Sequence, residues 1–95
     1  MHRYYFDLDY FDDHLTDLEG TILDNLFSAE AEARDAILDL AAESLKTRKA
    51  FRLVSIEIRA DDQYLSRVTV SDALGQLMPL ANFKFDWQYY FRLQS

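Results

Sequence analysis

The chain has 95 residues, of which 49% are hydrophobic and 15% aromatic, a composition that predicts a packed domain rather than a disordered segment. Ten basic against seventeen acidic residues give a net charge of -7, which argues against bare nucleic acid as a partner because polyanions are bound through Lys and Arg. The absence of cysteine excludes disulfides, Cys-ligated metal sites and thiol catalysis.

The N-terminal residues M-H-R-Y-Y-F-D carry charges where a signal peptide needs an apolar core. No stretch approaches the roughly 20 apolar residues of a membrane-spanning helix. We therefore expect a cytoplasmic protein that contacts no membrane. With one Pro and two Gly, no linker marks a boundary, so residues 1–95 are expected to form a single domain.

The first predicted element is a strand from Arg3 to Tyr10. Apolar and polar residues alternate along it, so one face carries Tyr4, Phe6, Leu8 and Tyr10. Residues 11–13 are polar enough to turn the chain, and a weaker run over residues 14–23 predicts the partner strand of a hairpin. Gly20 within this run predicts a bulge or a turn with positive φ.

A long amphipathic helix is predicted from about residue 26 to residue 46. Asn25 precedes it as a favourable N-cap. Apolar or small residues recur three and four positions apart and define the inner side of the helix: Leu26, Ala29, Ala33, Ile37, Leu40 and Ser44. Because this side is rich in Ala, the helix axis can approach a sheet closely.

A second hairpin follows the helix. Its first strand has alternating apolar residues, namely Val54, Ile56 and Ile58. Residues 60–63 turn the chain and residues 64–70 form the returning strand. Residues 71–81 contain the single proline, Pro79, and predict a short helical turn or loop.

The strongest pattern lies near the C-terminus. Every second residue is large and apolar, which predicts a strand with one continuous aromatic face: Phe83, Phe85, Trp87, Tyr89, Phe91 and Leu93. Exposed, these rings would form a patch beyond the ~300–600 Å² typical of monomers. Because the helix already has four strands to cover, we expect a second copy to cover this face in a homodimer; the competing hypothesis is that the tail folds back onto its own sheet.

Together these elements predict an α+β fold. An antiparallel sheet of four to five strands packs on one long helix, in the order strand, strand, helix, strand, strand, strand.

Acidic residues are concentrated in the N-terminal stretch: Asp7, Asp9, Asp12, Asp13, Asp17 and Glu19. The simplest interpretation is a soluble surface. A sharper alternative is that this acidic patch docks on a basic protein surface, as an inhibitor that mimics DNA does.

No motif indicates catalysis or a cofactor. His2 and His14 fit no standard metal-ligand spacing, and the segment beginning at Asp7 lacks the Gly and Glu of a calcium loop. The serines lie in no nucleophile motif, and there is no glycine-rich phosphate loop. We therefore expect no metal, no cofactor and no catalytic residue.

Several short motifs resemble those of a family of small bacterial proteins, domain-of-unknown-function family 6894. Residues 1–7 resemble its M-x-R-Y-F-F-[DH] opening and residues 17–23 its D-x-E-G-x-x-L motif; an E-A-rich helix, an I-E-V-like strand and a V-x-[VF]-x-D-A segment follow. The resemblance covers roughly residues 1–74, so residues 75–95 extend beyond the family-like core. It implies a small α+β domain and brings no activity. Where the family often has Gly in the second hairpin turn, this chain has Asp62, which can adopt the left-handed conformation.

Two functional hypotheses follow. The leading one is a non-catalytic interaction or homo-oligomerisation module, whose aromatic strand contacts a second copy or another protein. The alternative is a small-molecule-binding domain or minor enzyme with a pocket between helix and sheet, lined by Tyr4, Tyr5, Tyr64 and Tyr89.

Overall fold

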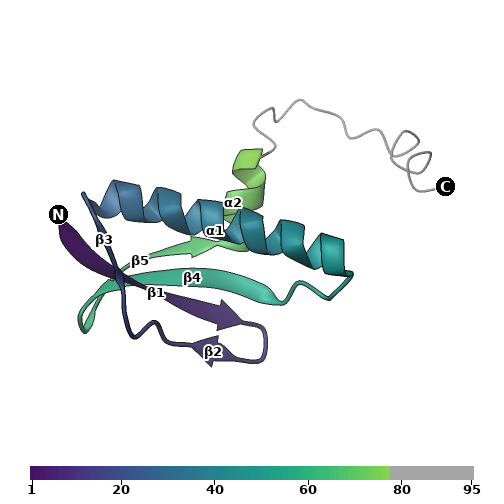
Figure 1. Ribbon diagram of the computed structural model, residues 1–95, viewed down its shortest axis with the longest axis horizontal. Coiled ribbons are helices and arrows are strands. Elements are labelled where there is room, and N and C mark those ends of the chain that lie inside the picture. The colour runs from purple at the N-terminus through teal and green to yellow at the C-terminus, as the bar shows by residue number, and fades with distance from the viewer. Residues whose placement is uncertain (78–95) are drawn as a thin grey trace.

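The computed structural model describes residues 1–77, which form one antiparallel sheet with two helices on the same face (Figure 1). The elements in chain order are β1 (His2–Tyr10), β2 (His14–Leu15), β3 (Thr21–Leu23), α1 (Leu26–Thr47), β4 (Leu53–Ala60), β5 (Gln63–Thr69) and α2 (Val70–Leu77). The predicted α+β class is confirmed, with one long helix between two groups of strands. The predicted strand at residues 83–93 lies outside the described residues.

The sheet order is β2-β1-β4-β5, and β3 also pairs with β1. β2 pairs with the end of β1 at Leu8 and Asp9, whereas β3 pairs with its start, residues 2–4. The sequence pattern predicted a single return strand over residues 14–23. The structure corrects this, because the segment around Asp17 leaves the ladder to bind backbone groups of its neighbours.

The core lies between the inner side of α1 and the centre of the sheet. Ala29, Ala33 and Ile37 are fully buried and belong to one cluster with Ile56 and Ile58 of β4. The predicted inner side of the helix is thereby confirmed. Burying a large aliphatic side chain contributes about 1.5–3 kcal/mol, so these contacts fix α1 on the sheet. α2 closes the same cluster through Ala73.

Both ends of α1 are capped. At its start the Asn25 Oδ1 accepts a hydrogen bond from the Ser28 backbone N–H at 2.8 Å, as the sequence predicted. At its end Arg48 adopts the left-handed conformation with φ 58°, and the Lys49 N–H donates to the Ser44 carbonyl at 3.1 Å. This is the Schellman pattern, with Arg where Gly is usual.

A β-bulge in β4 changes which residue faces the core. Tyr10 pairs with Leu53 and Asp9 with Ser55, so Val54 has no opposite residue in β1. Leu53 is consequently buried, whereas Val54 is 45% exposed. The prediction that Val54 shares the inner face with Ile56 and Ile58 is therefore wrong.

The turn between β4 and β5 consists of Asp61 and Asp62, flanked by the pair Ala60 and Gln63. The left-handed residue is Asp61, with φ 55°, rather than Asp62 as the family resemblance suggested. The turn is kept, with its strained residue one position earlier. Asp tolerates this conformation better than most residues.

Candidate functional site

Asp17 holds the segment between β2 and β3 against β1. Its Oδ2 accepts a hydrogen bond from the Phe6 N–H at 3.0 Å. Its Oδ1 accepts from the N–H groups of Glu19 and Gly20, both at 3.1 Å. One carboxylate thereby satisfies three backbone donors, and it fixes a segment that has no strand partner of its own.

Asp7 and Arg59 complete this network on the outer face of the sheet, the face away from the helices. The Asp7 side chain is only 8% exposed and accepts from the Arg59 Nε at 2.8 Å and from the Asp17 N–H at 2.8 Å. Arg59 also donates to the Asp17 carbonyl at 2.8 Å and lies over the Tyr5 ring, 4.6 Å from its centroid. The buried carboxylate is therefore paired and hydrogen-bonded, as burial of a charge requires.

The electrostatics of the network favour its charged form. Burial raises the pKa of Asp17, but the N–H donors of Phe6, Gly20 and Glu19, together with Arg59, outweigh it and lower the pKa below its ordinary value. The hydrogen bond to Asp7 raises the pKa of Arg59. A general acid or base working near neutrality needs a pKa near the operating pH. The lowered pKa therefore suits Asp17 for holding the segment between β2 and β3 rather than for moving protons.

Gly20 allows the segment between β2 and β3, the β2–β3 loop, to approach β1. Its φ is 73°, and an added Cβ would lie 2.8 Å from the Arg3 Cγ and 3.0 Å from the Tyr4 carbonyl oxygen. The predicted positive φ is confirmed. The two motifs that carried the family resemblance near the N-terminus, residues 3–7 and 17–20, thus meet in one structural network.

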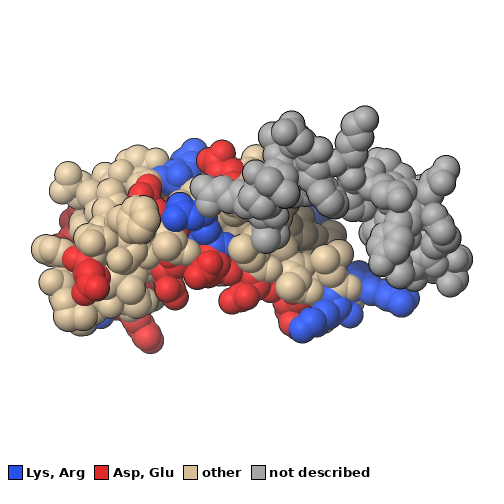
Figure 2. Space-filling model, turned by 90° about the horizontal axis from the view of Figure 1, so that it is seen from above, with Lys and Arg blue, Asp and Glu red and all other residues tan. Residues whose placement is uncertain are grey.

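The predicted acidic patch is divided by the fold. Asp7 is buried, and Asp17 is bonded to the backbone as described above. Asp12 pairs with Arg52 at 3.0 Å, and Asp9 lies 3.5 Å from the His14 Nδ1; Asp13 accepts from the His14 N–H, and Glu19 accepts through its backbone carbonyl from Arg3. Docking of these acids on a basic protein stays a prediction. On the face seen from the helix side, acidic side chains are interspersed with basic and uncharged ones (Figure 2).

A serine, a histidine and an aspartate lie side by side on the outer face, but in the wrong order for catalysis. Asp9 pairs with His14 on one side and with Ser55 on the other. Neighbouring strands are about 4.8 Å apart, so the carboxylate separates the imidazole from the hydroxyl. A triad needs the histidine next to the nucleophile. The Ser55 hydroxyl is buried and has no hydrogen-bond partner among the described residues.

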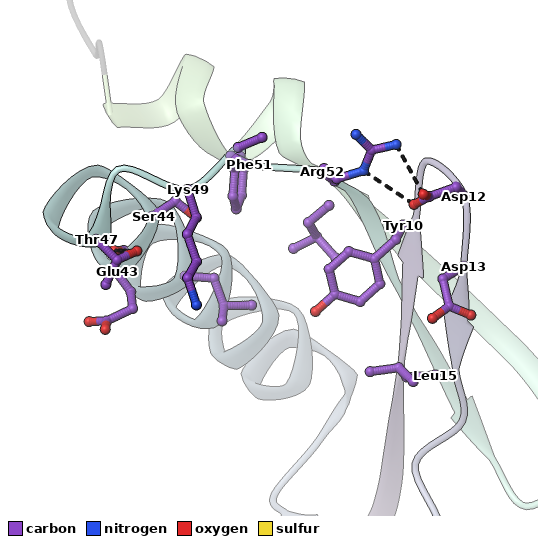
Figure 3. A pocket seen from close by; sticks show the side chains of 13 residues that line it. Tyr10, Asp12, Asp13, Leu15, Glu43, Ser44, Thr47, Lys49, Phe51 and Arg52 are labelled. Atoms are coloured by element: carbon purple, nitrogen blue, oxygen red, sulfur yellow. Dashed lines mark hydrogen bonds and ion pairs between the residues drawn. The ribbon is translucent and has the colours of Figure 1, made fainter.

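An open groove of about 440 Å³ lies between the C-terminal half of α1 and the β1–β2 hairpin (Figure 3). Its large apolar lining residues are Tyr10, Leu15, Leu40, Phe51 and Leu53. Its charged lining residues are Asp12, Asp13, Glu43, Lys49 and Arg52. Figure 3 shows Glu43, Ser44 and Thr47 on the helix side, with Tyr10 and Leu15 on the hairpin side.

The groove has a local cause in the sequence. Ala29 and Ala33 let the first half of α1 lie close to the sheet, whereas the larger Leu40 occupies the inner side further along. β2 is only two residues long, and the C-terminal turns of α1 extend past the ends of β1 and β2 (Figure 1). The end of the helix is therefore incompletely supported.

The tyrosine-lined pocket predicted between helix and sheet is corrected by the structure. Tyr4 is buried in the core, and Tyr5 stacks with Arg59 on the outer face. Tyr64 is 57% exposed and pairs with Arg59 across β4 and β5. Alternation along β1 puts Tyr4 and Tyr5 on opposite faces, and Tyr89 lies outside the described residues. The groove in the structure is lined by a different tyrosine, Tyr10.

The predicted interface residues lie in a part of the chain that the structure does not describe. The interface candidates Phe83, Phe85, Trp87, Tyr89, Phe91 and Leu93 lie outside residues 1–77, so their role stays a prediction. Within residues 1–77, no group of three His, Asp or Glu side chains could hold a metal ion. No helix in the same range is long and apolar enough to cross a membrane.

Comparison with known proteins identifies the family. No curated protein and no solved structure matches the chain. The model of the family DUF6894, described as a domain of unknown function, matches residues 3–71. These residues run from β1 into the start of α2 and include the Asp7–Asp17–Arg59 network. The match covers well over half of the sequence, and the chain therefore belongs to the DUF6894 family.

Proposed function

We propose that this protein is a non-catalytic protein–protein interaction module that forms a homodimer through residues 83–93, here called the aromatic segment. The observation that carries the proposal is the unbroken alternation of this segment. Its large apolar side chains fall at every second position, and the positions between them hold Lys84, Asp86, Gln88, Tyr90 and Arg92. An extended chain with this pattern presents a single apolar face that needs a cover.

The described part of the chain supports a cover from outside. The inner face of the sheet is occupied by α1 and α2, and Ile37 and Ala73 at their contacts are at most 1% exposed. The centre of the outer face carries the Asp7–Arg59 ion pair and the pair between Glu57 and Arg67. Within residues 1–77, the ion pairs and helices thus take up both faces of the central strands.

The area of the aromatic segment favours a second copy as the cover. Each aromatic side chain buries roughly 150–250 Å². A two-fold contact lets the same segment of each copy cover the other, and such symmetric dimers are the commonest oligomers. The charged groups that the structure gathers, Asp7, Asp17 and Arg59, are engaged in holding the β2–β3 loop. This supports a binding function over a catalytic one.

The experiment compares neighbouring residues on the two faces of the aromatic segment. We expect Tyr89→Ser to raise the dimer dissociation constant by roughly thirtyfold, the effect of losing a buried aromatic anchor. Gln88→Ser, on the opposite face, should leave it nearly unchanged. Sedimentation equilibrium of the full chain measures both constants. Equal effects of the two substitutions would contradict an interface built on the aromatic face.

A second candidate function is small-molecule binding in the groove. A volume of about 440 Å³ lies within the roughly 300–1,000 Å³ of ligand pockets, whose lining is mostly apolar with a few polar groups. Native mass spectrometry of protein purified without denaturation tests this candidate. A retained mass that is lost in Ser44→Phe and kept in Leu45→Phe would favour it, since Ser44 lines the groove and Leu45 is 81% exposed outside it.

A further inference from the structure

We infer that the groove between α1 and the β1–β2 hairpin is the docking site for aromatic rings of residues 83–93 from a second copy of the chain. The inference rests on the proposed homodimer and adds the surface on which the aromatic segment lies.

The chemistry of the groove suits aromatic rings. Leu40, Phe51 and Leu53 belong to or pack against the hydrophobic core and also line the groove, so an inserted ring would extend the existing core. Leu15 on the opposite wall is 50% exposed and would lose apolar surface to water on docking. Burial of that kind is the main favourable term in association.

A second cavity among the described residues is a poorer match. It measures about 400 Å³ and lies beside β5 and α2. Its lining includes Glu30, Arg34, Arg67 and Asp72, with Val68 as its large apolar residue. Rings placed there would have one large apolar residue to pack against, whereas five such residues line the groove. The aromatic segment therefore fits the groove better than the edge of the sheet at β5.

The charges at the groove complement those of the segment. Arg52 is already paired with Asp12, which leaves Asp13 and Glu43 against Lys49 among the charged residues that line the groove. The segment carries Lys84 and Arg92 near its two ends, against Asp86 alone. A groove with one excess negative charge thus faces a segment with one excess positive charge, which favours correct encounter.

The size of the segment favours a partner copy over the segment's own chain. A groove of about 440 Å³ cannot enclose six large side chains, so some rings need another cover. In a two-fold dimer the two aromatic segments can cover each other where they leave the grooves. Leu77 ends α2, and the six residues from there to Phe83 can extend about 20 Å, enough to cross to a neighbouring molecule.

The sequence itself supplies the probe for a direct test. The chain has one tryptophan, Trp87, and no cysteine. A nitroxide on Thr47→Cys would stand at the groove, and one on Leu45→Cys, outside the groove and 81% exposed, provides the control. Both labelled chains also carry Trp87→Phe, so that all tryptophan emission after mixing comes from unlabelled parent protein.

With labelled chains in excess, we expect the Thr47 label to quench most of the Trp87 emission of the parent protein and the Leu45 label to quench little. Absence of quenching in mixtures whose light-scattering mass is that of a dimer would overturn the groove while leaving the proposed homodimer intact. A monomer mass would overturn both. A third sample, the Thr47→Cys-labelled chain that keeps its own Trp87, tests the competing arrangement: quenching there without quenching in the mixtures would overturn docking between copies.

A substitution that fills the groove gives an independent readout. Ser44→Phe should weaken the dimer by roughly ten- to a hundredfold, because the new ring would occupy space that a docked ring of the partner copy needs, and losing a buried aromatic anchor has an effect of about that size. Leu45→Phe should have little effect. Far-ultraviolet circular dichroism shows whether each variant is folded. A folded Ser44→Phe protein that dimerises like the parent would overturn the inference.

Discussion

At the scale of single residues, the network around Asp17 explains why two separated motifs occur in this chain. Asp17 accepts hydrogen bonds from three backbone N–H groups, and Asp7 accepts hydrogen bonds from both Arg59 and the β2–β3 loop. Gly20 lets this loop come into contact with Arg3. Each of these residues acts on the backbone of the segment between β2 and β3. The network is a clamp on the outer face of the sheet, and it predicts effects on stability.

The two glycines form a matched pair for testing the clamp. Gly20→Ala should lower the free energy of unfolding by about 1–2 kcal/mol, the cost of the left-handed conformation, with a further loss because its Cβ would meet Arg3 at 2.8 Å. Gly75→Ala, in α2 with nothing within 4 Å of its Cβ, should raise it by about 0.5–1 kcal/mol. Urea denaturation measures both. Similar effects of the two substitutions would show that the loop does not need Gly20.

Asp17 also predicts how stability depends on pH. Its pKa in the folded protein is lowered from the ordinary value of 3.8. The ionised carboxylate therefore contributes stability that is fully present above the unfolded-state pKa and is lost as the pH falls through the folded-state pKa. We expect Asp17→Asn to lose less stability than the parent between neutral pH and pH values below 3.8. Parallel pH profiles of the urea midpoint in the two proteins would contradict this.

At the scale of elements, the long helix was predictable because its signal is local. The spacing of Ala29, Ala33 and Ile37 is set within the helix, and Asn25 marks its start. The split of the return strand into β2 and β3 was not predictable, since it depends on Asp17 reaching the Phe6 N–H across the sheet. The bulge at Val54 likewise depends on register with β1. Periodicity within a segment carries no information about either.

The inner side of α1 should not tolerate a charged residue. Ile37→Asp or Leu40→Asp should unfold the domain, because an unpaired charge facing the core is too costly to keep. Leu45→Asp on the exposed side of the same helix should leave the thermal midpoint nearly unchanged. Circular dichroism melting compares the three. A charge in the core usually lowers the thermal midpoint by far more than about a degree or two. A midpoint for Ile37→Asp within that range of the parent would therefore show that the helix face is wrongly assigned.

At the scale of the whole molecule, the groove arises where segments distant in sequence meet. Leu15, Leu40 and Phe51 come from the first hairpin, the helix and the connection after it. In the sequence Leu40 belongs to the apolar side of the helix, whereas Leu15 and Phe51 belong to no periodic pattern, and nothing local places the three together. The aromatic segment is the opposite case, because its alternation is visible without any structure. The candidate interface was therefore predictable from one side only.

In the function that we propose, the aromatic segment makes the protein a homodimer. Multi-angle light scattering of the full chain at micromolar concentration, with Trp87 emission recorded on the same sample, tests it most directly. We expect twice the chain mass of 11.2 kDa, together with a blue-shifted emission from buried Trp87. A mass of 11.2 kDa with the same blue shift would contradict it, because the aromatic face would then be covered within a single chain.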